Sequence, residues 1–261
     1  MGNRRICLLW VCLIMGLILG GVNRVFAEET SNQTIYNELF EKAIALKEAG
    51  DYETALNIFK KIADDSNKNQ IQYTDALVEQ SMILKDKNNP DWFAKAKEAG
   101  YKIKVLYSKN YPNPDYWMVY AKYSALVNKE RHVIAAFRKL FYYSPDNVEG
   151  YIAKGDTYVF MAINTDPLET YDTTDDLFAD NDNDKFIRQE RGKIAKEAYE
   201  TALMNPTLEN KRKAYVHYKL GKLETEVFSN KEKAVENWKK AVGSASESIY
   251  GKKSAELLKS Y

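Results

Sequence analysis

The chain has 261 residues, of which 45% are hydrophobic and 29% are charged, a balance typical of a folded globular protein and not of a disordered one. Its formal net charge of +1 gives no electrostatic reason to expect a nucleic acid partner. A chain of this length forms one elongated domain or two small ones.

Residues 1–27 have the sequence of features that is typical of a secretory signal peptide. Arg4 and Arg5 precede an uninterrupted apolar run over 6–22, and the segment VFA then ends at Ala27. This order predicts cleavage after Ala27 and a mature chain that is periplasmic or secreted, with no membrane span. The alternative is an inner-membrane anchor formed by residues 6–22, because that run approaches the length that crosses a bilayer.

The two cysteines of the chain, Cys7 and Cys12, both lie in this N-terminal segment. Cleavage therefore leaves residues 28–261 without a thiol for a disulfide, a nucleophile or a metal ligand. We expect the exported chain to be held together by packing alone.

Two segments near the start of residues 28–261 share one helical pattern. LFEKAIALKEAG (39–50) and LVEQSMILKDKN (77–88) place a small residue, Ala43 or Ser81, between larger apolar residues on one stripe of a helix. A turn at Gly50 and a second amphipathic segment follow the first of them. The small residue lets a neighbouring helix approach closely.

The pattern recurs and resembles the tetratricopeptide repeat, a helix–turn–helix unit of about 34 residues. The segment YWMVYAKYSALVNKERHVIAAFRKLFYYSP carries Trp117, Ala121, Phe137 and Pro145 where that family places its large, small, aromatic and terminating residues. The resemblance implies an all-α fold, a right-handed α-solenoid of about five repeats over residues 28–261. The repeats are expected to begin near Tyr36, Thr74, Pro114, Val148 and Ala214, and a capping helix to follow over about 245–261.

The fourth repeat is interrupted by an insertion over about 164–184. Gly155 belongs to its first helix, and its second helix is expected in RGKIAKEAYETALMNP (191–206). Pro167 disfavours helical geometry in the residue before it and so ends the first helix. Asp184 is the expected N-cap of the second helix.

The insertion is acidic, with eight carboxylates and no cation over 165–184. Asp180, Asp182 and Asp184 alternate as in the first half of an EF-hand calcium loop. That loop ends in a bidentate glutamate, and here the corresponding residue is Arg191. We therefore expect no metal site and a solvated loop. The alternative is a ligand-binding module in which these carboxylates capture cations or a basic partner.

No catalytic motif stands in the sequence. It lacks a glycine-rich phosphate loop, a His-Glu-x-x-His pair and a Gly-x-Ser-x-Gly elbow. Its two histidines, His132 and His217, are expected to be structural. We expect neither an enzyme nor a cofactor.

The resemblance implies that the fifth and ninth residues of each first helix face a concave groove. The fifth residues are apolar or aromatic: Phe40, Val78, Met118, Ile152 and Tyr218. The ninth residues are apolar at one end of the array and charged at the other: Ile44, Met82, Lys122, Asp156 and Lys222. The sequence leaves two interpretations open, a groove that binds a partner peptide and simple packing between first helices. The predicted function is a non-enzymatic scaffold of the periplasm or cell envelope that binds another protein or peptide.

Overall fold

The computed structural model describes residues 36–65, 70–164 and 181–261, and every regular element in these ranges is an α-helix. Backbone contacts divide the chain into two compact units, Met1–Ile62 and Ala63–Tyr261, and each is considered by itself. Among the helices in these described ranges, none has the length and apolar character to span a bilayer. The apolar run over 6–22 and most of the acidic insertion lie outside the described residues.

The first unit contains a helical hairpin. A helix over 36–48 is followed by α2 (Tyr52–Asp65), and between them Gly50 adopts a φ of 81°, which glycine tolerates best. The rings of Phe40 and Phe59 meet edge to face with centroids 5.3 Å apart. Ala43 and Ala55 are fully buried, so small side chains let the two helices of the hairpin pack closely.

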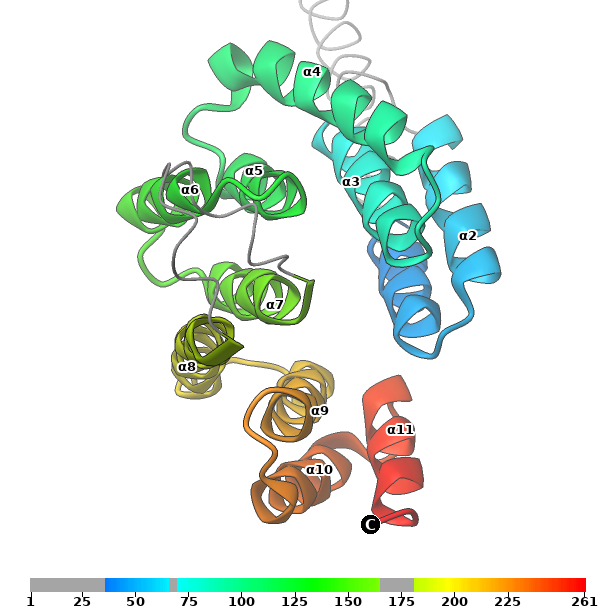
Figure 1. Cartoon of the computed structure of the whole chain (residues 1–261), viewed down its shortest axis with the longest axis vertical. Coiled ribbons are helices and arrows are strands. Elements are labelled where there is room, and N and C mark those ends of the chain that lie inside the picture. Colours follow the sequence, from blue (N-terminus) through cyan, green and yellow to red (C-terminus); the bar gives the residue numbers. More distant parts are fainter. Residues whose placement is uncertain (1–35, 66–69, 165–180) are drawn as a thin grey trace, which may run out of the picture. The chain divides into compact units, whose positions relative to one another are not determined.

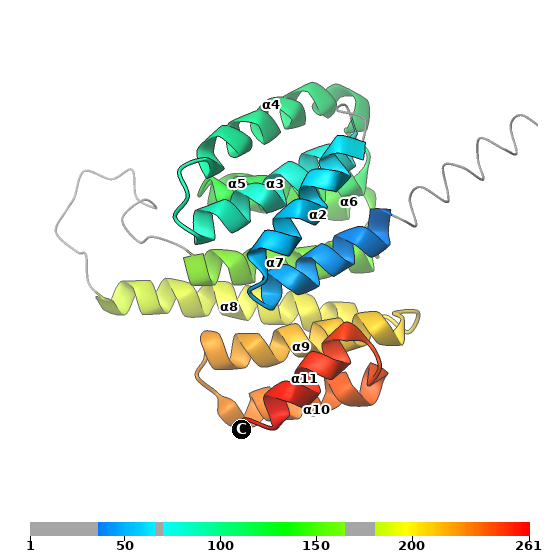
Figure 2. The same cartoon turned by 90° about the vertical axis from the view of Figure 1, so that its right-hand side faces the viewer.

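The second unit is a succession of helical hairpins followed by a single helix (Figures 1 and 2). In chain order the pairs are α3 (Ile71–Asp86) with α4 (Trp92–Asn110), α5 (Pro114–Leu126) with α6 (Glu130–Tyr143), α7 (Val148–Asn164) with α8 (Asn181–Leu203), and α9 (Asn210–Glu226) with α10 (Lys231–Ala245). Helix α11 (Ile249–Leu258) completes the described chain.

Each hairpin of the second unit packs on the next one. The first helices form a continuous row in which α3 contacts α5, α5 contacts α7 and α7 contacts α9. Each second helix also contacts the first helix of the following pair, as α4 does with α5 and α8 with α9. A chain in which each pair contacts its neighbours in sequence is a solenoid. The prediction of an all-α solenoid is therefore confirmed for this unit.

The same turn recurs between the helices of several pairs. Asn88, Asn128 and Ser229 have φ values of 53°, 56° and 54° and follow α3, α5 and α9. After each of them the next backbone N–H donates to a carbonyl in the last turn of the preceding helix, for example Lys129 N to Ser124 O at 2.7 Å. This is the left-handed ending that satisfies the otherwise unpaired carbonyls of a helix. The polar side chain of asparagine makes the conformation accessible without glycine.

Close contacts between the helices of a pair depend on glycine at one position. A Cβ atom on Gly155 would lie 2.4 Å from the ring of Tyr199, and one on Gly221 would lie 2.2 Å from Nε1 of Trp238. Both rings are buried on the second helix of the same pair. Ala121 takes the equivalent position in α5 and is also fully buried. The small residue of the sequence pattern is thus the point where the second helix crosses the first.

The start of α8 corrects one prediction. The helix begins at Asn181, so Asp184 lies inside its first turns and is not the N-cap. Acidic residues are favourable near a helix N-terminus, where the backbone dipole is positive, so the helix extends through them. The second helix of the fourth predicted repeat, α8, is therefore longer than the sequence suggested, at 23 residues.

Helix α11 covers the end of the row. It contacts α9 and α10, and the ring of Tyr250 lies 4.7 Å from that of Tyr215 and 5.3 Å from that of Tyr218. The Ser248 hydroxyl accepts a hydrogen bond from Gly251 N at 3.0 Å and so caps α11. These contacts pack α11 against the α9–α10 hairpin.

Replacing Gly221 by alanine should destabilise the second unit by about 1–3 kcal/mol, because the added methyl group overpacks against Trp238. Gly243 in α10 is the matched control, since a Cβ atom there meets nothing within 4 Å. Gly243→Ala should be neutral or stabilising by up to about 1 kcal/mol, through helix propensity alone. Urea denaturation of both variants measures the difference. Equal effects at the two positions would show that α9 and α10 are not in this close contact.

Candidate functional site

The apolar fifth residues of the first helices in the second unit are mostly buried. Val78, Ile152 and Tyr218 are 0%, 2% and 4% exposed. Met118 alone among them is partly exposed. Three of these side chains therefore contribute to packing between helices, and a partner can reach only Met118 directly. In the first unit, Phe40 is half-buried against α2.

The ninth residues include the charged side chains of this row. Lys122, Asp156 and Lys222 are all partly exposed, whereas Met82 is buried. Ile44, in the first unit, is half-buried. Four of the fifth and ninth residues on α5, α7 and α9 are partly exposed. We call them the first-helix face: Met118, Lys122, Asp156 and Lys222.

Lys122 joins α5 to α3 through two carboxylates. Its Nζ lies 2.8 Å from Oδ1 of Asp75 and 3.3 Å from Oε1 of Glu79. These two acidic residues are one helical turn apart on α3, so both face the same cation. All three side chains are largely withdrawn from water, with exposed fractions of 18%, 13% and 5% for Lys122, Asp75 and Glu79.

The ionisation of this cluster follows from burial and from the neighbouring charges. Desolvation opposes the charged form of Lys122, but the carboxylates of Asp75 and Glu79 outweigh it and raise the pKa of the ammonium above its ordinary value. Burial raises the pKa of Asp75, against the opposing effect of Lys122. The lysine therefore stays charged throughout the physiological range and holds the two helices together.

Asp156 has the same role between α7 and α9. Its Oδ1 accepts a hydrogen bond from the Tyr199 hydroxyl at 2.6 Å, and its Oδ2 accepts one from the Tyr215 hydroxyl at 2.7 Å. The ammonium of Lys219 lies 3.5 Å from Oδ1. Tyr199 comes from α8, so one carboxylate ties together three helices.

The two clusters use equivalent positions. The ninth residue of one first helix, Lys122 or Asp156, reaches two residues of a neighbouring first helix that are one turn apart. On α3 these are Asp75 and Glu79, and on α9 they are Tyr215 and Lys219. The sign of the charge is reversed between the two clusters, and so is the direction, because Lys122 contacts the preceding first helix and Asp156 the following one.

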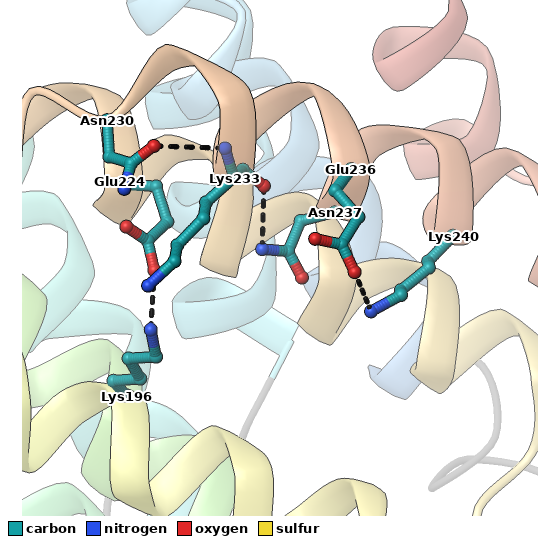
Figure 3. A network of polar contacts seen from close by, with 7 residues as sticks. All are labelled: Lys196, Glu224, Asn230, Lys233, Glu236, Asn237 and Lys240. Atoms are coloured by element: carbon teal, nitrogen blue, oxygen red, sulfur yellow. Dashed lines mark hydrogen bonds and ion pairs between the residues drawn. The ribbon is translucent and has the colours of Figure 1, made fainter.

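Further ion pairs join the α7–α8 hairpin to the α9–α10 hairpin. Lys196 of α8 pairs with Glu224 of α9 at 2.6 Å, and Figure 3 shows both side chains between the two helices. On the adjoining α10, the Asn230 side chain accepts a hydrogen bond from Lys233 N and caps the helix (Figure 3). Arg212 of α9 pairs with Glu149 of α7. The interface between the third and fourth hairpins of this unit thus combines charges from three helices.

Arg191 of α8 is a buried cation at the interface between the α5–α6 and α7–α8 hairpins. Its side chain is 3% exposed, and its guanidinium lies 2.8 Å from Oε2 of Glu130 at the start of α6. It also donates to the carbonyl of Met161 in α7 at 3.2 Å. A buried charge of this kind needs such partners, because unpaired it would be costly. The sequence identified Arg191 only as the residue that interrupts a calcium loop.

The calcium-loop pattern does not form a loop in the described part of the chain. Residues 181–191 are helical, which is not the conformation in which an EF-hand loop wraps its ion. Asp180 lies outside the described residues, and Asp182 and Asp184 belong to α8. Within residues 36–65, 70–164 and 185–261, no three histidine, cysteine or acidic side chains gather closely enough to hold a metal ion.

Both histidines are part of helix contacts. The Tyr120 hydroxyl and Nδ1 of His132 lie 2.6 Å apart and join α5 to α6. His217 is half-buried on α9, and burial lowers its pKa below the ordinary value. Neither ring lies beside an ion pair of the first-helix face.

Sequence reasoning named Lys122 and Asp156 but missed their partners. Asp75 and Glu79 are four residues apart on one helix, and Tyr215 and Lys219 repeat that spacing. This spacing is the signal that could have pointed to paired side chains facing one neighbour.

Replacing Lys122 by methionine should destabilise the second unit by about 3–5 kcal/mol, because it leaves two buried carboxylates without a cation. Adding Asp75→Asn and Glu79→Gln to that variant should recover most of the loss. Lys240→Met is the matched control, since its ion pair with Glu236 is more than half exposed and should contribute less than about 1 kcal/mol. Chemical denaturation measures all of these variants. A loss no larger at Lys122 than at Lys240 would contradict the role assigned to the cluster.

Comparisons with known proteins give few matches. No protein-family model and no curated protein matches this chain. Among solved structures, the MamA protein is similar with 16% sequence identity and a TM-score of 0.39, and the match covers 81% of this chain and 90% of that one. A structure from Bacteroides ovatus ATCC 8483, described as a protein-binding protein, is similar with 18% identity and a TM-score of 0.26. That match covers 86% of this chain and 96% of the other. At these scores the description of the fold rests on the helix packing itself.

Proposed function

We propose that this protein is a non-enzymatic scaffold of the tetratricopeptide type that binds a partner protein or peptide through the first-helix face. The observation that carries the proposal is the unbroken row of first helices, α3 to α5 to α7 to α9. Such a row presents equivalent side chains at regular intervals, which is how repeat proteins bind extended partners.

The chemistry of the face indicates a polar partner. Lys122, Asp156 and Lys222 are partly exposed charges, and Met118 is the partly exposed apolar side chain among them. The larger apolar residues of the predicted groove are committed to packing, so apolar anchoring of the partner is limited to Met118. A peptide with charges of both signs would complement this face and gain specificity and association rate from it.

The titratable groups of the row support a binding role over a catalytic one. The carboxylates and cations with the tightest contacts, those of Lys122, Asp156 and Arg191, join helices to one another. A group that acts as acid or base must instead be placed to exchange a proton with a substrate.

We infer that the protein is exported, on the order of charges and apolar residues over 1–27, which lie outside the described part of the chain. The mature N-terminus is then Glu28. Mass spectrometry of the protein recovered from the cell envelope should show a chain that starts at Glu28. An intact N-terminus in the membrane fraction would contradict export by cleavage and support the anchor over 6–22.

Photocrosslinking tests the binding face. A photoreactive phenylalanine derivative at Met118 or at Lys222 should crosslink the same partner in cells, because both positions belong to the first-helix face. Lys239 is the matched control, an exposed residue on the second helix α10. The same derivative at Lys239 should give no such product. Crosslinks of equal strength from all three positions, or none from Met118 and Lys222, would reject this face as the binding site.

A further inference from the structure

The C-terminal ends of α4 and α6 meet in a cluster of tyrosines. The ring of Tyr111, just after α4, lies 5.3 Å from that of Tyr107 and 5.5 Å from that of Tyr143. The ammonium of Lys139 donates to the Tyr111 hydroxyl at 2.9 Å, and it lies 6.0 Å from the ring centroid of Tyr142. We call these five residues the tyrosine–lysine patch.

The patch continues along the outer sides of both helices as exposed apolar side chains. Tyr101 and Tyr107 of α4 are 65% and 46% exposed, and Tyr142 of α6 is 77% exposed. Val105 and Ile134 are also exposed, at 41% and 39%. Six of the eleven exposed large hydrophobic side chains in the described residues lie on α4 and α6. Exposed apolar side chains that gather in one area mark an interaction surface, whereas single scattered ones are ordinary.

The charge on this surface is mostly positive, and Glu98 and Glu130 are the acidic residues of α4 and α6. Residues 99–111 and 131–144 contain six lysines and arginines and neither aspartate nor glutamate. Lys102 lies over the ring of Tyr73, but the other five are exposed: Lys104, Lys109, Arg131, Arg138 and Lys139. The formal net charge of the whole chain is only +1, so the rest of it is net acidic. This surface is therefore net positive, although the chain as a whole is nearly neutral.

Helix α10, the second helix of the last hairpin, has no such basic and aromatic surface. Its exposed lysines alternate with acidic residues, and Lys240 pairs with Glu236 at 2.6 Å. None of the exposed large hydrophobic side chains in the described part of the chain lies on it. The basic and aromatic surface is thus a property of α4 and α6 and not of second helices in general.

We propose that the outer surface of α4 and α6 binds the headgroup layer of an anionic lipid bilayer. Each cation close to such a surface is attracted by the negative headgroups. Tyrosine is suited to the interface, because its ring enters the apolar side while its hydroxyl stays hydrated. This site is separate from the first-helix face and does not depend on it.

The exposure of the aromatic rings favours a bilayer over a peptide as the occupant. Peptide anchors are received in pockets whose walls exclude water. Tyr101 and Tyr142 instead project from the surface with most of their area in solvent. Projecting rings surrounded by cations suit insertion into a soft and negatively charged layer.

Cosedimentation of the full chain with lipid vesicles tests the proposal. The probe is a mixture of phosphatidylglycerol and phosphatidylethanolamine, with pure phosphatidylcholine vesicles as the background. The apolar run over 6–22 can insert into both kinds of vesicle, so the readout is the difference between them. We expect stronger binding to the anionic vesicles, and we expect about 0.5 M salt to remove that excess because salt screens the attraction.

Variants locate the binding on this surface. Lys104→Gln with Arg138→Gln removes two exposed cations and should lower the anionic excess on the order of tenfold or more, since each cation contributes about fivefold. Tyr142→Ala should also lower binding, with little change in its salt dependence. Lys233→Gln with Lys239→Gln on α10 is the matched control and should leave binding unchanged. Thermal melting of each variant confirms that the fold is intact.

Three results would overturn the proposal. The first is equal binding of the unchanged chain to anionic and zwitterionic vesicles. The second is an equal loss in the α10 control and in the α4 and α6 variant. The third is binding to soluble polyglutamate that is lost in the α4 and α6 variant while anionic vesicles are not bound, which would assign the surface to an acidic protein.

Discussion

The pairing of Lys122 and Asp156 with neighbouring helices is the constraint on which the arrangement of the second unit depends. Both side chains lie where adjacent first helices meet and are partly withdrawn from water, so an unpaired charge there would be costly. Each is matched by two groups one turn apart on a neighbour. Apolar packing holds the helices together, and these contacts determine which residues meet.

The same constraint connects stability to binding. In a solenoid each hairpin is stabilised by its neighbours, so a contact between two hairpins affects the whole row. Lys122 and Asp156 are both partly exposed and both committed to such contacts. A partner that bound them would compete with or reinforce these ion pairs. Binding at the first-helix face would therefore change the coupling between hairpins as well as occupy a surface.

Much of the fold could be predicted from local patterns in the sequence. The small residues Ala43 and Ala121 indicated where a neighbouring helix approaches, and both are fully buried in the structure. A small residue at helical spacing allows close packing whatever residue faces it. Its role can therefore be predicted before the facing residue is known.

The polar contacts could not be predicted in the same way, because they depend on which side chains become neighbours in space. Glu130 and Arg191 are separated by 61 positions and by the acidic insertion, yet they form an ion pair. The start of α8 was also missed, since acidic residues are compatible both with a loop and with the first turn of a helix. The candidate binding site stays a prediction, and the burial of Val78 and Ile152 agrees at these two positions with the interpretation of packing between first helices.

A double-mutant cycle tests most directly whether polar contacts couple neighbouring hairpins. Asp156→Ala, Tyr215→Phe and the double variant remove the hydrogen bond between α7 and α9 from either side and from both. The free energies of unfolding should show a coupling of about 1.5–3 kcal/mol, because a hydrogen bond to a charged group contributes in that range. Additive losses, with a coupling near zero, would contradict a role for Asp156 in coupling α7 to α9.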